Sequence, residues 1–369
     1  MLLMLTRLRL HRITSHISPM AALPSQISTT TNNPMTVAVI CPPENVSFLS
    51  AINMTSRNDG VQFIIANDLH TFTAHPNFST IRALLFVAVG GKVSLLPTLY
   101  EACGTVEWVH SLFAGVDALA PFIASHLLSD NIPLTNGRGA FSSSLAEYVM
   151  ASALHFNKQI PRIQHNQQTK TWDKFIMPTL KGKTMGFVGF GHIGQTSAKL
   201  AKQFGMKILA LRRNPTKIDH DGIADVVLGL PEKRRLFEES DFVVSVLPGT
   251  QETVNFCSVD EFSAMKKEGI FISVGRGLVV DEEALADALE NDEIAGAALD
   301  VFKTEPLPSE SRLWTVPTDR ILLTAHNADF TSDYWESGCN IFEQNLVSYL
   351  QGGRRDGDLC TPVDKHCGY

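Results

Sequence analysis

Short apolar runs and amphipathic helical patterns alternate along this chain from residue 36 onward. The alternation is typical of parallel α/β architecture, because parallel strands are joined by crossover connections long enough to hold a helix. Strands are expected in a first series at residues 37–41, 61–66, 83–89 and 109–113, and in a second series at residues 185–190, 207–211, 242–247, 270–274, 297–301 and 321–325. The two series predict two open parallel sheets with helices on their faces.

The length of the chain also favours two domains. It has 369 residues, and a single hydrophobic core stops growing at roughly 250–300 residues. A turn-rich stretch at residues 133–141 precedes Ser144 and Glu147, whose spacing predicts a capping box at the start of a helix that runs to about residue 156. We therefore place one domain at residues 36–141 and the other at residues 142–329. Residues 330–369 are too few for a third domain and are expected to complete the first.

The first 35 residues have a different composition from the rest. They contain Arg7, Arg9 and Arg12, many Ser and Thr, and no acidic residue, and the first Glu is Glu44. This bias is expected of an organelle transit peptide and predicts mitochondrial localisation. The alternatives are a disordered leader, or a start at Met35 that would give a cytoplasmic protein.

Composition excludes several classes of function. Apolar residues make up 44% and charged residues 19% of the chain, as in globular proteins. A formal net charge of -7 argues against a nucleic-acid partner, because phosphate binding needs a basic surface. No apolar run reaches the roughly 18 residues that span a bilayer, so no membrane partner is expected. The cysteines lack C-x-x-C spacing, which disfavours a structural zinc site, and we predict no metal.

A glycine-rich turn is the first strong chemical signal. Gly189, Gly191 and Gly194 form the pattern G-x-G-x-x-G between an expected strand and an expected helix. In such a turn the first glycine permits the bend, the second lets the backbone approach a pyrophosphate, and the third allows close helix–strand packing. The context predicts a dinucleotide site, and the alternative is an ordinary β–α turn. The residues that we assign to cofactor binding here and near later strand ends are Gly189, Gly191, His192, Ile193, Gly194, Leu247, Pro248, Thr253 and Val274.

Two arginines at the end of the next expected strand indicate which dinucleotide is bound. Arg212 and Arg213 occupy the place where an NAD site would have Asp or Glu on the ribose 2′-hydroxyl. A guanidinium binds a 2′-phosphate, whereas a carboxylate repels it. The pair predicts NADP(H) as the preferred cofactor, with NAD(H) possible. The alternative is two solvated arginines at a strand end.

Three further polar residues follow later strands, at the side of an open sheet where ligands bind. Arg276 follows the strand at 270–274, Glu305 follows the strand at 297–301, and His326 closes the last strand. Taken singly, each of them could be structural. Their order after a dinucleotide turn instead indicates an acid–base site.

These motifs together resemble the D-isomer-specific 2-hydroxyacid dehydrogenase family from about residue 36 to the end of the chain. The resemblance rests on the glycine turn, Arg276-Gly277, the segment Leu-Asp-Val-Phe-x-x-Glu-Pro at residues 299–306, and His326, in that order. It implies two Rossmann-like doubly wound domains with a cleft between them and a homodimer, with the helix from Ser144 as one candidate contact. The closing segment 363–369 is similar to the glyoxylate/hydroxypyruvate reductase branch.

The resemblance also implies roles for individual residues. His326 would be the general acid/base, Glu305 would orient its ring, and Arg276 would hold the carboxylate and carbonyl of the substrate. Hydride transfer to a 2-keto acid builds negative charge on the carbonyl oxygen, which a proton donor and a fixed cation would stabilise. Asp300 would contact the nicotinamide carboxamide. The backbone N–H groups expected to receive the substrate carboxylate belong to Ala114, Gly115 and Val116.

The sequence departs from the family pattern at Ser273, Ala325 and Asn327, where Asn, Pro and Ile are frequent. These changes affect the shape of the pocket and leave the acid–base residues in place. We expect an NADPH-dependent reductase of a small 2-keto acid, glyoxylate or hydroxypyruvate. The alternatives are a reductase of a bulkier 2-keto acid and a dinucleotide-sensing binding protein like the corepressors of the family.

Overall fold

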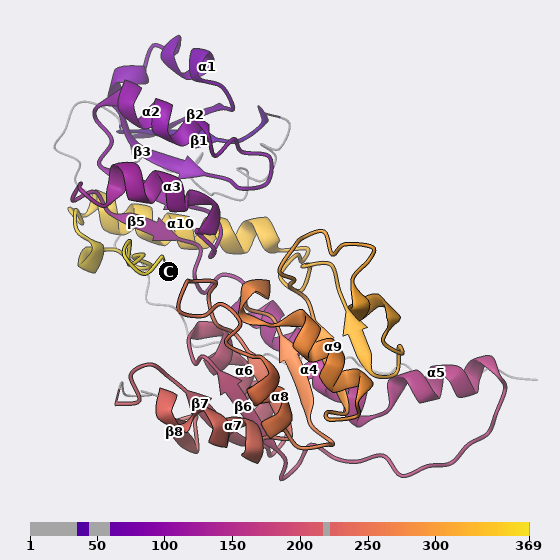
Figure 1. Cartoon of the computed structure of the whole chain (residues 1–369). Helices are drawn as coiled ribbons and strands as arrows, with labels where there is room; N and C mark the ends of the chain where they lie inside the picture. Colours follow the sequence, from indigo (N-terminus) through magenta and orange to yellow (C-terminus); the bar gives the residue numbers. More distant parts are fainter. Residues whose placement is uncertain (1–34, 44–59, 217–221, 369) are drawn as a thin grey trace, which may run out of the picture.

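A computed structural model describes residues 35–43, 60–216 and 222–368. These residues form two lobes, one built on a five-stranded sheet and the other on a seven-stranded sheet (Figure 1). Every strand pair is parallel. The two parallel sheets with their helices confirm the predicted fold class. The predicted leader lies outside the described residues except for Met35, so its role stays a prediction.

The smaller sheet has the strand order β2-β1-β3-β4-β5. Its strands are β1 (Met35–Ile40), β2 (Val61–Ala66), β3 (Ile81–Phe86), β4 (Trp108–Ser111) and β5 (Leu134–Asn136). The short helices of this region are α1 (Leu69–Thr73), α2 (Leu95–Cys103) and α3 (Ala120–Phe122). They pack on one face of the sheet through a cluster that includes Phe72, Leu96 and Phe122.

The other face of the smaller sheet is covered by the last helix of the chain, α10 (Tyr334–Leu350). Phe342 and Leu346 of α10 pack in one buried cluster with Val37 and Trp108. Beyond α10, the N–H of Val363 donates to the carbonyl oxygen of Leu134 in β5 at 2.8 Å. The segment after residue 330 therefore returns to the first sheet.

The larger sheet has the strand order β12-β11-β10-β9-β6-β7-β8. Its strands are β6 (Thr184–Val188), β7 (Lys207–Leu211), β8 (Val226–Leu228), β9 (Phe242–Ser245), β10 (Ile270–Ser273), β11 (Gly296–Leu299) and β12 (Ile321–Leu323). The order runs outward from β6 in both directions, so the crossover direction reverses between β6 and β9. In open α/β sheets, ligands bind at this switch point, beyond the carboxyl ends of the strands.

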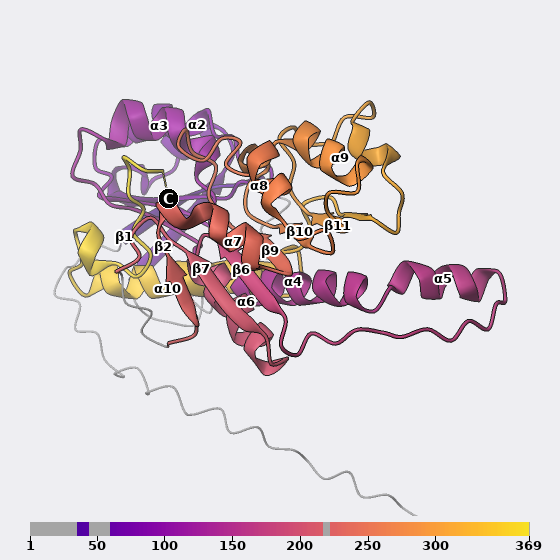
Figure 2. The same ribbon diagram turned by 60° about the horizontal axis from the view of Figure 1, so that its bottom comes forward.

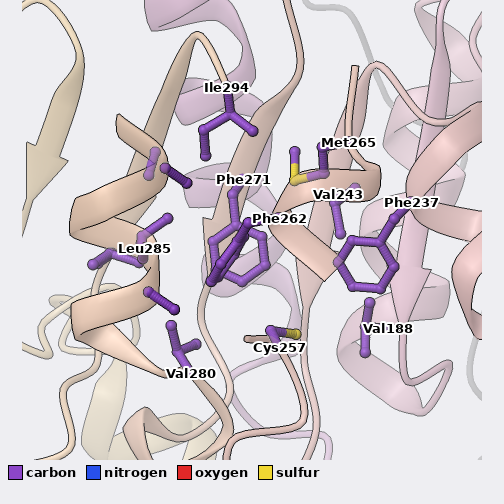
Figure 3. Close-up of a cluster of buried hydrophobic side chains, with 14 of the residues drawn as sticks. Val188, Phe237, Val243, Cys257, Phe262, Met265, Phe271, Val280, Leu285 and Ile294 are labelled. Carbon is purple, nitrogen blue, oxygen red and sulfur yellow. The ribbon is translucent and has the colours of Figure 1, made fainter. Parts of the chain in front are cut away.

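Helices cover both faces of the larger sheet. α4 (Ser142–Asn157) and α6 (His192–Gln203) pack in one cluster, and α7 (Lys233–Glu239), α8 (Val259–Ala264) and α9 (Glu282–Glu290) pack in another. In the second cluster Phe237, Phe262 and Phe271 are fully buried, and the rings of Phe262 and Phe271 meet edge to face at 5.2 Å (Figure 3). Burial on both faces explains why the strands are apolar throughout rather than alternating.

One helix does not pack on either sheet. α5 (Ile160–Gln168) and the loop after it extend away from the body of the molecule (Figure 2). None of the α5 residues is buried. In the described part of the chain, no helix has the length and apolar character to cross a membrane.

The predicted capping box at Ser144 is wrong. α4 begins at Ser142, and Ser144 lies inside its first turn. The Ser144 hydroxyl donates to the carbonyl oxygen of Ala328 rather than to its own helix. The sequence also missed β5, β8 and α5, because the two strands have three residues each and α5 has few apolar residues to mark it.

Candidate active site

The candidate residues follow five neighbouring strands of the larger sheet. Parallel strands all end at one edge, so the loops after β6, β9, β10, β11 and β12 lie in the order in which these strands pair. Each of these loops carries at least one candidate residue, namely Gly189, Leu247, Arg276, Asp300 and His326. The topology therefore gathers the dinucleotide turn and the polar residues along a single edge.

The three glycines of the turn meet different surroundings. Gly189 has a φ of 93°, and a Cβ there would lie 2.9 Å from Leu247 Cδ2. A Cβ on Gly194 would lie 3.0 Å from the carbonyl oxygen of Gly189, so α6 packs closely on the turn. Gly191, by contrast, has no atom within 4 Å of the Cβ position. It lies at the N-cap of α6, just before His192 and Ile193, so the space at this helix start fits a pyrophosphate.

The loop after β9 is held by Thr253, which is 7% exposed. Its hydroxyl donates to the carbonyl oxygen of Pro248 at 2.6 Å and accepts from the N–H of Thr250 at 2.8 Å. Val274 is 4% exposed, and its N–H donates to the backbone carbonyl oxygen of Ser245 at 3.1 Å. The structure thus places Thr253 and Val274 as supports of this edge, and their contact with a cofactor stays a prediction.

Arg212 and Arg213 lie just after β7 and reach in different directions. The Arg212 guanidinium donates to the carbonyl oxygen of Phe190 at 2.9 Å and lies 5.2 Å from the centre of the Phe190 ring. Arg213 forms an ion pair with Glu252 at 2.7 Å, and both side chains are more than half exposed. Arg212 is therefore folded against the glycine turn, and Arg213 bridges to the loop after β9.

His326 and Glu305 form an acid–base pair at this edge. Glu305 Oε2 lies 2.7 Å from His326 Nδ1, and Glu305 Oε1 accepts from the N–H of Phe302 at 2.9 Å. The side chains are 38% and 36% exposed. Because Nδ1 is engaged by the carboxylate, Nε2 is the ring nitrogen that can serve a bound substrate.

Arg276 reaches across to the loop after β4, in the first lobe. Its Nε donates to Asp117 Oδ2 at 3.0 Å. A Cβ on Gly115 would lie 1.8 Å from Arg276 Nη2, so the guanidinium packs directly on the bare backbone of that loop. The structure thus brings Arg276 together with the segment 114–116, where the substrate carboxylate was predicted to bind.

Two carboxylates near this centre were not assigned from the sequence. Asp117 follows the predicted segment directly, and Asp329 lies three residues after His326. Burial raises the pKa of Asp329, while the positive charges of His326 and Arg276 act to lower it. In the sequence, Asp117 and Asp329 are marked only by their closeness to assigned residues. Many other residues are equally close, so this signal could not single out the two carboxylates. Among residues 35–43, 60–216 and 222–368, no group of three His, Cys, Asp or Glu side chains is arranged to hold a metal ion.

Asp300 was predicted to contact the nicotinamide. In the structure it is 1% exposed, and its carboxylate accepts hydrogen bonds from the segment 324–328. The carboxylate therefore acts within the chain, and a contact with a cofactor stays a prediction.

Comparison with known proteins places this edge among dehydrogenases. Residues 150–328 match the NAD binding domain of the D-isomer specific 2-hydroxyacid dehydrogenases. A glyoxylate reductase of Thermococcus litoralis is 34% identical over 232 residues, which cover 60% of this chain and 68% of that protein. Glyoxylate/hydroxypyruvate reductase B of Escherichia fergusonii is 34% identical over 234 residues, covering 61% of this chain and 67% of that protein. The chain thus spans about two thirds of the length of these curated relatives.

A solved structure is similar over a longer region. The D-isomer specific 2-hydroxyacid dehydrogenase of Xanthobacter autotrophicus, in complex with NADPH and MES, covers 91% of this chain. All of that chain is matched, with a TM-score of 0.76 and 25% identity.

Proposed function

Because this chain belongs to the D-isomer specific 2-hydroxyacid dehydrogenase family, we propose that it reduces a small 2-keto acid to the D-2-hydroxy acid with NADPH. Glyoxylate and hydroxypyruvate are the leading substrates, since relatives at 34% identity carry these names. The observation that carries the proposal is the His326–Glu305 pair at 2.7 Å, on the same sheet edge as an arginine that reaches the loop at 114–117.

The proposed mechanism uses each of these residues once. When bound, NADPH would supply the hydride that adds to C2 of the keto acid. His326 then gives a proton from Nε2 to the carbonyl oxygen, while Glu305 fixes the ring through Nδ1. Arg276 stabilises the negative charge that builds on this oxygen, and it orients the carboxylate together with the N–H groups of the loop at 114–116. The hydride on C2 and the proton on the oxygen together convert the carbonyl to a hydroxy group. The products would be the D-2-hydroxy acid and NADP+.

The choice of NADPH rests on the two basic residues after β7. Arg212 and Arg213 stand where an NAD site would have a carboxylate. Arg212 lies against the glycine turn, and Arg213 pairs with Glu252 in the loop after β9. The Xanthobacter autotrophicus relative was crystallised with NADPH. NADH remains a slower alternative within this proposal.

Turnover of a panel of 2-keto acids with NADPH and NADH tests the proposal. We expect the highest kcat/KM with glyoxylate or hydroxypyruvate and NADPH. His326→Gln should lower kcat by about 100-fold or more, which is the usual contribution of a general acid. Arg212→Asp should move the preference toward NADH, and Arg234→Asp, at a side chain of α7 that is 65% exposed, is the matched control. A preference for bulky keto acids, or dinucleotide binding without turnover, would favour the alternative substrates or a sensor.

We also propose a homodimer, formed through the segment 160–180 that contains α5. Trp172 and Ile176 in this segment are 98% and 91% exposed. Two large apolar side chains held away from the body of a protein are typical of an interface. α4, the earlier candidate, offers less surface because half of its residues are buried within its own chain.

A further inference from the structure

His326 has an unusual backbone conformation. Its φ is 49°, in the left-handed region that is unfavourable for a residue with a Cβ. Such a conformation persists only where surrounding contacts impose it. Contacts on both sides of His326 must therefore supply the constraint.

Asp300, just after β11, supplies most of these contacts. Its backbone oxygen accepts from the N–H of His326 at 2.8 Å. Its carboxylate accepts from the N–H groups of Asn327 and Ala328, both at 3.1 Å, and from the Thr324 hydroxyl at 2.6 Å. These donors replace the water that a fully buried carboxylate loses. Asp300 thus fixes the chain immediately before and after the imidazole.

α4 extends this network from the opposite side. Tyr148 Oη lies 2.8 Å from Thr324 Oγ1. Thr324 has one hydroxyl proton, which goes to the Asp300 carboxylate, so Tyr148 must be the donor to Thr324. Burial raises the pKa of Tyr148, so its phenol keeps the donated proton at neutral pH. Ser144 lies one turn earlier on α4, and its hydroxyl donates a hydrogen bond to the carbonyl oxygen of Ala328.

We propose that Thr324 and Tyr148 are positioning residues that hold the turn at His326 so that its imidazole stays on Glu305. The inference rests on the proposed reduction of a 2-keto acid. Neither residue has a place in the proton or hydride transfer itself. Because the left-handed turn is imposed by its hydrogen bonds, removing them lets the turn relax toward an ordinary conformation. Misplacement of a reacting group by about 1 Å can cost a large part of the rate.

Steady-state kinetics with NADPH and the best keto acid separate positioning from binding. We expect Thr324→Val to lower kcat by about 10-fold or more, and Tyr148→Phe to lower it by several-fold. The Kd of NADPH, measured by fluorescence titration, should stay within twofold in both variants. Thr324→Ser retains the hydroxyl and should restore kcat to within twofold of the wild type.

Tyr349→Phe is the matched control. Tyr349 in α10 is buried and, like Tyr148, donates its hydroxyl to a single side-chain acceptor, here Glu107 at 2.6 Å, away from the candidate site. We expect it to lower Tm as much as Tyr148→Phe does, with kcat unchanged. The proposal is overturned if Thr324→Val and Tyr148→Phe both keep kcat within twofold, or if Thr324→Ser loses as much as Thr324→Val.

A second measurement does not depend on turnover. The proton between His326 Nδ1 and Glu305 should give a downfield NMR signal, which is identified by its loss in His326→Gln. We expect the signal in the wild type, Thr324→Ser and Tyr349→Phe, and its loss or broadening in Thr324→Val. An unchanged signal in Thr324→Val overturns the positioning role, even if no keto acid is reduced. Absence of turnover with the expected signals would instead defeat the proposed function alone.

Discussion

His110, in the middle of β4, is a fully buried histidine outside the candidate active site. Its Nδ1 lies 2.7 Å from Thr135 Oγ1, and its Nε2 has no hydrogen-bond partner among the described residues. The ring packs against Trp108 and Phe342. Burial lowers the pKa of His110 from 6.5 to about 3, because the charged imidazolium would lose its water. A single residue thereby makes the stability of the first lobe depend on pH.

The sign of this dependence follows from proton binding. The unfolded chain protonates His110 below about pH 6.5, whereas the folded chain does so only near pH 3. The stabilising contribution of the neutral, buried imidazole is therefore fully present above pH 6.5 and is lost as the pH falls from 6.5 toward 3. The loss reaches about 1.4 kcal/mol per pH unit. We expect His110→Gln, which cannot titrate, to be less stable than the wild type at pH 7.5, with a gap in Tm that narrows at pH 5.5. Parallel Tm curves for the two proteins would contradict the prediction.

Among the secondary-structure elements, the unit formed by β6, the glycine turn and α6 contains glycines that are present for two different reasons. Gly186 in β6 is needed by the fold, because a Cβ there would lie 2.2 Å from Ser240 Oγ and 2.9 Å from Leu236 Cδ2. Gly191 is not, because nothing lies within 4 Å of its Cβ position and its φ is -83°. A requirement for glycine at 191 would therefore come from a ligand.

This difference predicts opposite behaviour of two similar substitutions. Gly191→Ala should unfold at nearly the wild-type Tm but bind NADPH at least 10-fold more weakly, because the methyl group would occupy the space of the pyrophosphate. Gly186→Ala should lower Tm by several degrees, as overpacking by about 1–3 kcal/mol does, and leave the NADPH Kd unchanged. Thermal unfolding and fluorescence titration measure both. Unchanged NADPH binding by Gly191→Ala would place the cofactor elsewhere.

In the whole molecule, the candidate site lies between the two lobes, and one segment projects from the larger lobe. The Arg276–Asp117 ion pair joins the loop after β10 to the loop after β4, across 159 positions of the chain. The candidate site therefore needs both lobes in place. α5 and the loop after it extend away from both lobes (Figure 2). We attribute the exposed side chains of Trp172 and Ile176 in this loop to contact with a second copy of the chain.

The proposed dimer is tested by changing the exposed residues of that segment. We expect the double variant Trp172→Glu, Ile176→Glu to be monomeric in light scattering after size exclusion, with unchanged circular dichroism, because neither side chain packs within its own lobe. Trp314→Glu is the control, since Trp314 is 55% exposed at another site and its replacement should leave the dimer intact. A monomeric wild type at micromolar concentration would refute the dimer.

Much of the architecture could be predicted because the signals are local. A buried parallel strand such as β9 is a continuous apolar run, and the turn after β6 needs glycine at fixed spacing. Short elements were not predicted, because a strand of three residues such as β5 or β8 is too short to show an apolar pattern. The predicted capping box at Ser144 was wrong because the Ser144 hydroxyl donates to the carbonyl oxygen of Ala328, 184 positions further along the chain.

The amino-acid sequence was enough to predict the two parallel sheets and the order in which Arg276, Glu305 and His326 follow their strands. Periodicity and spacing are properties of neighbouring residues and can be read without coordinates. Three contacts became known from the folded structure: Arg276 packs on Gly115, the Asp300 carboxylate accepts from the N–H of Asn327, and Tyr148 of α4 lies within hydrogen-bond distance of Thr324. These contacts join residues far apart in the chain, and only the packing of the elements determines which side chains meet.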